Sequence, residues 1–278
     1  FYDYVAARGI KMSNTLKNYD AVVEDALRDF ERSKLVVKLK DEDEDLEEDV
    51  FTFDESKRLT LEYYKNNVIH FLLPAVFVST SILAQQTFRV SLTQMLEDIA
   101  FLKDFFKYEF VYNNDLSNED LVQGVLDVFE AQGWLHPTGD GDQPYLLAHK
   151  GLKAADAFHG LIRNYFEGYW LVLRSFQYLQ KKPYAEKDLL KKILSLGEKS
   201  LKLELIERQE SISKIIFGNA LKYYVERNVV SKSSDGEKGK DAEVYSGVGD
   251  RQLIQHYSKQ IGRFMRSPRF TLQVEVEP

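Results

Sequence analysis

Histidine is the side chain best suited to acid–base chemistry at neutral pH, and this sequence has five histidines. A catalytic histidine needs a carboxylate that orients it and a reacting group within reach. His70 lies in the stretch LTLEYYKNNVIHFLLPAVFVSTSIL, from Leu59 to Leu83, and its immediate neighbours are apolar. We therefore expect His70 to be a buried histidine with a hydrogen-bond partner rather than a catalytic group.

The residues before His70 predict a polar face on one helix. Four polar residues recur there at three- and four-residue spacings, which places them on the same side of a helix: Tyr63, Asn66, Asn67 and His70. A polar stripe beside a long apolar run suits a surface that forms hydrogen bonds to a neighbouring domain. We predict that these four residues form such an interface.

Several other kinds of site are absent from the sequence. With no cysteine, the chain has no disulfide, no zinc–thiolate site and no thiol nucleophile, which fits a reducing compartment. The segment GDGDQ lacks the lysine of a phosphate-binding loop, and no His/Glu pair has metalloprotease spacing. The acidic run Asp41–Asp49 contains no glycine, so it predicts a solvated loop rather than a calcium site. We expect no cofactor and no metal.

Between Arg251 and Phe270 basic residues alternate with apolar ones, and no carboxylate occurs. A basic amphipathic helix of this kind can lie on an anionic lipid surface. It can equally be a surface helix that packs on the protein core, and the sequence leaves both possibilities open. The residues that would contact a membrane are Lys259, Arg263, Arg266 and Arg269.

Three segments share one pattern, which begins with a leucine and continues with an aromatic residue three positions later. An apolar pair follows, starting eight residues after the leucine, and then two short apolar runs flank a polar turn. Helix followed by β-hairpin is the natural interpretation. It predicts winged-helix-like units at about residues 12–57, 112–150 and 186–248, with the leucines at Leu27, Leu126 and Leu221.

The rest of the chain predicts helices. Apolar stripes indicate core helices over Leu92–Phe110 and Ala155–Leu179, and Pro74 should end a helix near Leu73 so that a second, buried helix follows. The alternating FTLQVEV from Phe270 predicts a final strand. The expected fold class is therefore mainly α, with small β-hairpins in winged-helix-like units and a C-terminal strand.

Length and charge limit the function further. The 278 residues are 44% apolar and suffice for a sizeable core, and a net charge of −7 is opposite to that of a typical nucleic-acid-binding protein. The apolar run from Val68 to Leu83 is shorter than the about 20 residues that span a bilayer. The sequence starts at Phe1 without a methionine or a signal peptide, which suggests a fragment of a longer protein.

The stretch LTLEYYKNNVIHFLLPAVFVS resembles the helix that opens the second half of the C-terminal region of glycerol-3-phosphate acyltransferases. In that family a Tyr-Tyr-basic-Asn-Asn run precedes an apolar segment with a histidine, and here the run is Tyr63 to Asn67, followed by His70. Three more segments resemble the same region of that family and occur in the same order: ALRDFERSKLV, EGYWLVLRSFQYL and IQHYSKQIGRFMRSPRFTLQVEV. The sister dihydroxyacetone-phosphate acyltransferases share this layout.

The resemblance implies a peripheral enzyme at the cytoplasmic face of a membrane. Such enzymes transfer a fatty acyl group from acyl-CoA or acyl-carrier protein to the sn-1 hydroxyl of glycerol 3-phosphate, in phospholipid biosynthesis. Their catalytic histidine and aspartate are separated by four residues, so that the carboxylate orients the imidazole. Here the residues five positions after each histidine are Ala75, Gly141, Ala154, Asn164 and Ile261, and the family's Pro-Glu-Gly segment is missing.

We therefore expect a non-catalytic C-terminal body that docks on the acyltransferase domain of the same polypeptide. The main alternative is a tandem winged-helix-like module that binds a protein or a nucleic acid and has no enzymatic role. The acidic net charge argues against DNA but is compatible with protein partners. A third possibility is an enzyme with a site of another kind.

Overall fold

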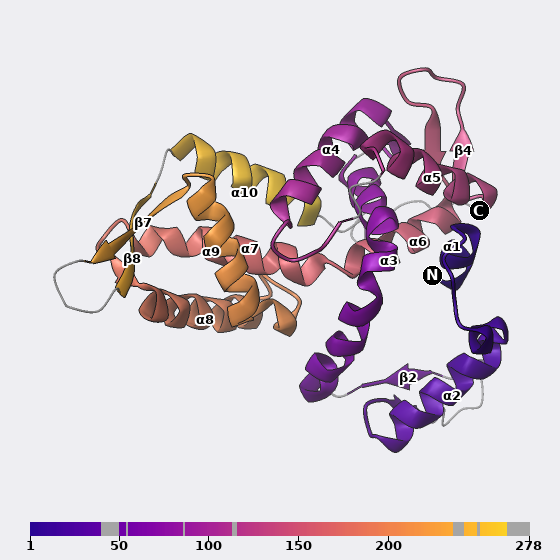
Figure 1. The fold of residues 1–278 in the computed structure, drawn as a ribbon, viewed down its shortest axis with the longest axis horizontal. Helices are drawn as coiled ribbons and strands as arrows, with labels where there is room; N and C mark the ends of the chain where they lie inside the picture. The colour runs from indigo at the N-terminus through magenta and orange to yellow at the C-terminus, as the bar shows by residue number, and fades with distance from the viewer. Residues whose placement is uncertain are drawn as a thin grey trace, which may run out of the picture. The chain divides into compact units, whose positions relative to one another are not determined.

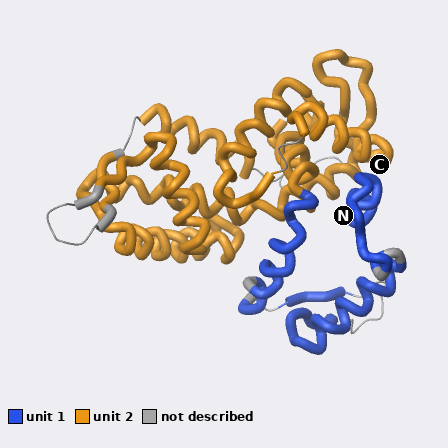
Figure 2. The backbone as a smooth tube through the Cα atoms, viewed as in Figure 1, with its two compact units in different colours: residues 1–72 blue, residues 73–278 orange. Residues whose placement is uncertain are grey.

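The structure is a computed structural model that describes residues 1–39, 50–53, 55–85, 87–112, 116–235, 242–248 and 251–265. They form two compact units, residues 1–72 and residues 73–278, which Figure 2 colours separately. The predicted acidic loop Asp41–Asp49 and the predicted strand from Phe270 lie outside the described residues. The two units are considered one at a time below.

The described chain is mainly helical with small antiparallel strand pairs, which confirms the predicted fold class (Figure 1). Its α-helices are α1 Tyr2–Ala7, α2 Tyr19–Arg32, α3 Arg58–Ala84, α4 Leu92–Phe105, α5 Asn118–Ala131, α6 His149–Gly160, α7 Arg163–Ser175, α8 Glu186–Lys202, α9 Lys214–Glu226 and α10 Arg251–Met265. Its strands are β1 Val37–Lys38, β2 Phe51–Thr52, β3 Arg89–Val90, β4 Leu135–Pro137, β5 Tyr145–Leu147, β6 Tyr184–Ala185, β7 Val230–Asp235 and β8 Ala242–Val248. Short 3₁₀ turns are η1 Asn14–Lys17, η2 Glu55–Lys57, η3 Phe176–Tyr178 and η4 Gln209–Ser211.

The unit of residues 1–72 contains α1, α2, the β1–β2 hairpin and the first half of α3. The hairpin is antiparallel, with Val37 opposite Thr52. Phe30 of α2 and Tyr64 of α3 pack against each other with ring centroids 5.3 Å apart. No residue of α2 is fully buried, and the apolar side chains Val22, Leu27 and Phe30 of this amphipathic helix are half-buried.

The unit of residues 73–278 contains two modules of the same topology. In one, β3 precedes α4, α5 and the β4–β5 hairpin, and the sheet order is β3-β5-β4. In the other, β6 precedes α8, α9 and the β7–β8 hairpin, and the sheet order is β6-β8-β7. In both, the strand before the two helices pairs with the last strand of the hairpin. This is the strand order of a winged helix, and the sequence pattern predicted the helix and hairpin but not the leading strands.

All three helix–hairpin junctions use the same C-terminal cap. The residue seven positions after the shared leucine has a left-handed backbone, with φ of 55° at Lys34, 63° at Gly133 and 56° at Asn228. The amide of the next residue then donates to the carbonyl of the shared aromatic at 2.8 Å, in the pairs Leu35–Phe30, Trp134–Phe129 and Val229–Tyr224. A left-handed residue followed by a bond back to the last turn is the Schellman end of a helix. It reverses the chain directly into the hairpin.

Helix α7 is central to the core of residues 73–278 and packs against α8, α9 and α10 (Figure 1). Aromatic rings fill the space beside it. The ring centroid of Phe105 on α4 lies 4.8 Å from that of Tyr169 and 5.2 Å from that of Tyr223. A Cβ atom at Gly168 would lie 2.5 Å from Ile216 Cγ2, so glycine is required where α7 approaches α9.

The predicted break at Pro74 is wrong, because α3 is one continuous α-helix from Arg58 to Ala84 with the proline inside it. A proline removes one helical hydrogen bond and costs about 3 kcal/mol in a helix interior. The residues that follow it, including Val76, Phe77, Val78 and Ile82, are each at most 1% exposed. Each buried side chain of this size stabilises the fold by about 1.5–3 kcal/mol, so packing outweighs the local cost.

The residues Thr60–Ala84 are long and apolar enough to cross a membrane by composition, the one such helix in the described part of the chain. Two observations favour a core helix instead. Of its most apolar window, 67% is buried inside the protein. Polar side chains of its second half are also bonded within the core, since Ser81 Oγ donates to Asp98 Oδ2 at 2.7 Å.

Candidate functional site

The face predicted as an interface is exposed on the first half of α3. Tyr63, Asn66, Asn67 and His70 all lie at the surface, with Tyr63 67% exposed. The expectation that His70 is buried is therefore wrong. Its ring lies against that of Phe71, with centroids 3.9 Å apart and the ring planes tilted by 42°.

Large apolar side chains are exposed next to this polar face. Of the sixteen large apolar residues that are exposed in the described chain, ten belong to residues 1–72, although that unit is much the smaller one. They include Tyr64 at 49%, Val68 at 51% and Phe71 at 44% on α3, and Tyr19 at 45% on α2. Contiguous apolar surface of this kind marks an interaction site in soluble proteins. The face on α3 is thus mixed, with amide, imidazole and aromatic groups together.

The charge around this surface is negative. Helix α2 carries five carboxylates and two arginines, and the arginines are engaged by carboxylates of the same helix. Arg28 lies 3.0 Å from Glu24, and Arg32 lies 3.3 Å from Asp29. An acidic rim repels an anionic lipid surface, so a protein partner with basic side chains fits this unit better.

Helix α10, predicted as a basic amphipathic helix, uses its apolar side for the core. Tyr257, Ile261 and Phe264 are buried, and the Phe264 ring lies 5.6 Å from that of Phe166 on α7. Arg263 forms an ion pair with the buried carboxylate of Asp98 on α4. Lys259 is exposed, while Arg266 and Arg269 lie outside the described residues. The arrangement is that of a surface helix that packs on the core.

The most deeply buried imidazole belongs to His159 on α6, which the sequence pattern did not single out. Its Nδ1 lies 3.1 Å from Thr80 Oγ1, whose own hydroxyl donates to the Val76 carbonyl, so Nδ1 carries the proton. Burial, together with the nearby positive charge of Arg163 and Arg208, lowers the pKa of His159 to about 4. A neutral imidazole that is closed to solvent holds helices together and has no route to a substrate.

A carboxylate at the centre of the same unit orders a loop. Glu167 is fully buried and accepts hydrogen bonds from Ser211 Oγ at 2.6 Å and from the amides of Glu207 and Arg208 at 3.0 and 2.9 Å. Arg163 Nε lies 3.3 Å from it and neutralises its charge. The carboxylate is saturated by protein donors, so it anchors the segment after α8 rather than serving as a base.

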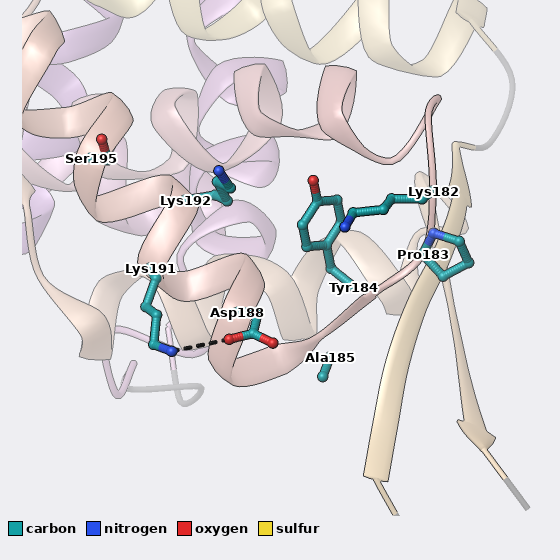
Figure 3. Close-up of a pocket in the computed structure, with 8 residues that line it drawn as sticks. All are labelled: Lys182, Pro183, Tyr184, Ala185, Asp188, Lys191, Lys192 and Ser195. Atoms are coloured by element: carbon teal, nitrogen blue, oxygen red, sulfur yellow. Dashed lines mark hydrogen bonds and ion pairs between the residues drawn. The ribbon is translucent and has the colours of Figure 1, made fainter. Parts of the chain in front are cut away.

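A cavity of about 440 Å³ opens where β6 meets α8, and Figure 3 shows its lining. Three lysines contribute to the lining, Lys182, Lys191 and Lys192, together with the ring of Tyr184. Its acidic side chain, Asp188, is paired with Lys191 at 3.1 Å. The sequence analysis missed this site, although the density of lysines before and along α8 is a signal that could have indicated it.

Metal chemistry has no evident place in the described ranges, where no group of three histidine, aspartate or glutamate side chains could hold an ion. The predicted face on α3 and the lysine-lined cavity are the two surfaces that the proposals below concern. Neither of them combines an imidazole with an orienting carboxylate.

Comparison with known families gives one match. A family model described as the glycerol-3-phosphate acyltransferase C-terminal region matches residues 1–233. The match includes α3 with its exposed face and both modules up to strand β7. A comparison with curated proteins finds no match.

Proposed function

The chain belongs to the glycerol-3-phosphate acyltransferase C-terminal region family, and from this membership we propose that it is the non-catalytic part of an enzyme that acylates the sn-1 hydroxyl of glycerol 3-phosphate. The acyl group comes from acyl-CoA or acyl-carrier protein. The observation that carries the proposal is the family match over residues 1–233, in a sequence where no histidine is followed by an aspartate at the catalytic spacing. The chemistry then belongs to an acyltransferase domain of the same polypeptide.

The role of this chain is to dock on that domain through the unit of residues 1–72. Three features support this role: the exposed amides of α3, the exposed aromatic rings beside them and the exposed Tyr19 and Val23 of α2. Interfaces of this composition, with Tyr and Phe among polar groups, hold protein domains together. The acyl product is a lipid, so the assembled enzyme works at the cytoplasmic face of a membrane, in phospholipid biosynthesis.

Replacing Asn66 and Asn67 together by alanine in the full-length enzyme tests this role. We expect glycerol 3-phosphate acylation to fall about tenfold, because loss of a few central interface contacts costs more than about 1 kcal/mol and misplaces the domain. Melting of the 278-residue chain alone should change little, since both side chains are exposed.

A matched control is the double change Gln123→Ala and Glu130→Ala on the exposed face of α5. It should retain full acylation. Equal activity of the two double variants, with both proteins folded, would remove the docking role from α3 and leave the family membership untouched.

The nucleic-acid alternative finds no support in the helix of the first module that would enter a groove, whereas the equivalent helix α9 of the second module carries Lys214 and Lys222. The second helix of the first module is α5, and its exposed side chains include Glu119, Asp120, Asp127 and Glu130. Its sequence contains no lysine or arginine. Duplex binding depends on cations that contact phosphates, so an acidic helix in this position is repelled.

A further inference from the structure

The segment along and just before α8 is strongly basic. Seven lysines against three carboxylates between Lys181 and Lys202 give this segment a net charge of +4, in a chain whose total is −7. All seven lysines are exposed. Their charge is therefore not used in the core, and apart from Lys191, which is paired with Asp188, it is available to a partner.

Five of these lysines lie on the helix itself and share one side of it. At 3.6 residues per turn they occupy an arc of about 140°, and the list is Lys187, Lys191, Lys192, Lys199 and Lys202. The buried side is opposite, where Leu189, Ile193 and Gly197 face the core. The helix is about 25 Å long, so the five lysines form an extended face whose net charge is positive although Asp188 and Glu198 lie on the same arc.

The cavity between β6 and α8 lies at the start of this face. Lys182 and Lys192 both line it, and within the described ranges neither is paired with a carboxylate. Lys182 Nζ lies 5.1 Å from the centre of the Tyr184 ring, and Figure 3 shows the Tyr184 hydroxyl beside it. Two ammonium groups and a phenol hydroxyl are hydrogen-bond donors that suit a phosphate.

Two exposed leucines follow the lysine face. Leu203, at the C-terminal cap of α8, is 69% exposed, and Leu205 is 47% exposed. Apolar side chains beside a row of lysines are typical of surfaces that adsorb to a bilayer, where the lysines meet headgroups and the leucines enter the acyl boundary. An acidic protein partner would explain the lysines but gives these leucines no particular place.

We propose that the α8 face binds an anionic phospholipid surface, with the phosphate of a headgroup in the cavity of Lys182, Tyr184 and Lys192. The inference rests on the proposed function, because acylation of glycerol 3-phosphate leaves a lipid that carries a terminal phosphate monoester. It assigns membrane contact to the middle of the chain, in place of α10, whose Arg263 is paired with Asp98.

Vesicle co-sedimentation of the 278-residue chain tests the proposal. The vesicles are phosphatidylcholine alone or phosphatidylcholine with a minor fraction of phosphatidic acid. We expect binding to the anionic vesicles only, and the variant Lys182→Gln with Lys192→Gln should bind them about twentyfold more weakly. The control Lys150→Gln with Lys153→Gln on α6 changes the net charge equally at two exposed positions and should lose less than about twofold.

Three results would overturn the inference, provided that circular dichroism shows every variant folded. The first is an equal loss of vesicle binding in the two double variants, and the second is no binding of the unaltered chain to anionic vesicles. The third is that inorganic phosphate or acyl-carrier protein binds to the cavity lysines while the chain does not bind vesicles. Acylation by the full-length enzyme in detergent solution is measured separately. If the unaltered chain does not bind anionic vesicles while the full-length enzyme still acylates in detergent, this inference is refuted and the proposed function stands.

Discussion

Burial shifts the pKa values of Glu109 and His159 in opposite directions. Burial raises the pKa of Glu109 to about 7, and hydrogen bonds from Asn219 and Tyr169 oppose the shift. Its Oε2 accepts a hydrogen bond from Asn219 Nδ2 at 3.1 Å, while its buried Oε1 accepts none from the described residues. The folded chain thus favours the protonated form of Glu109 and the neutral form of His159.

Glu109→Gln should change how stability depends on pH. A carboxyl whose pKa is about 7 when folded and about 4.5 when unfolded contributes stability that is complete below pH 4.5 and is lost as pH rises through 7. Between pH 5 and pH 8 we expect the wild-type chain to lose about 2–3 kcal/mol of stability relative to the variant. Urea midpoints at both pH values measure this difference.

His159 makes stability depend on pH in the opposite direction, but it does so in both proteins and therefore cancels in the comparison. Glu130→Gln on the exposed side of α5 is the control and should follow the wild type. If the stability of Glu109→Gln has the same pH dependence as that of the control, Glu109 is solvated in the folded chain and folding does not raise its pKa.

At the scale of elements, the helix–hairpin junction is the recurring unit of this chain. Each copy combines a leucine and an aromatic on one helical turn, a left-handed residue, and an apolar pair that starts the hairpin. Glycine and asparagine tolerate the left-handed backbone at Gly133 and Asn228. Lys34 occupies the corresponding position at the end of α2 with a φ of 55°, where a lysine is strained.

Lys34→Gly should therefore stabilise the chain. We expect a gain of about 0.5–1 kcal/mol, because glycine takes the left-handed conformation without steric cost. Chemical denaturation followed by circular dichroism measures it, and Lys38→Gly in strand β1 serves as the opposite control, since glycine weakens a strand. A destabilised Lys34→Gly chain would mean that the lysine side chain, and not the backbone, decides the end of α2.

At the scale of the whole molecule, the two proposals assign binding to two separate surfaces. Residues 1–72 present an acidic unit with exposed aromatic and amide groups, which suits a protein domain. Within residues 73–278, helix α8 presents lysines and leucines, which suit a lipid surface. The core of that unit holds its charged groups in closed networks around Glu167 and Asp98.

The isolated 278-residue chain should show no acyl transfer from a thioester to glycerol 3-phosphate. Its most buried histidine is held by Thr80 and carries a pKa of about 4, and His70 is exposed without a carboxylate that orients it. A thiol-release assay with acyl-CoA measures the rate, with the full-length enzyme as the positive control. Turnover above that of heat-denatured chain would show that a catalytic group lies within these residues.

The sequence by itself determined the local features of this protein. A leucine, an aromatic and an apolar pair at fixed spacings are enough to specify a helix that ends and turns into a hairpin, and three copies form as predicted around Lys34, Gly133 and Asn228. Local hydrogen bonds and one-turn contacts decide these features, so they are visible in a short window of residues. The missing histidine–aspartate spacing was visible in the same way.

Only the tertiary structure decided the features that join distant residues. Strands β3 and β6 have two residues each, too few to show an alternating pattern, and they exist because β5 and β8 pair with them. Helix α3 continues through Pro74 because its second half is packed inside the core, and Arg263 meets Asp98 from far along the chain. The energies that settle these points come from burial and charge pairing between separate elements, which no local pattern of residues contains.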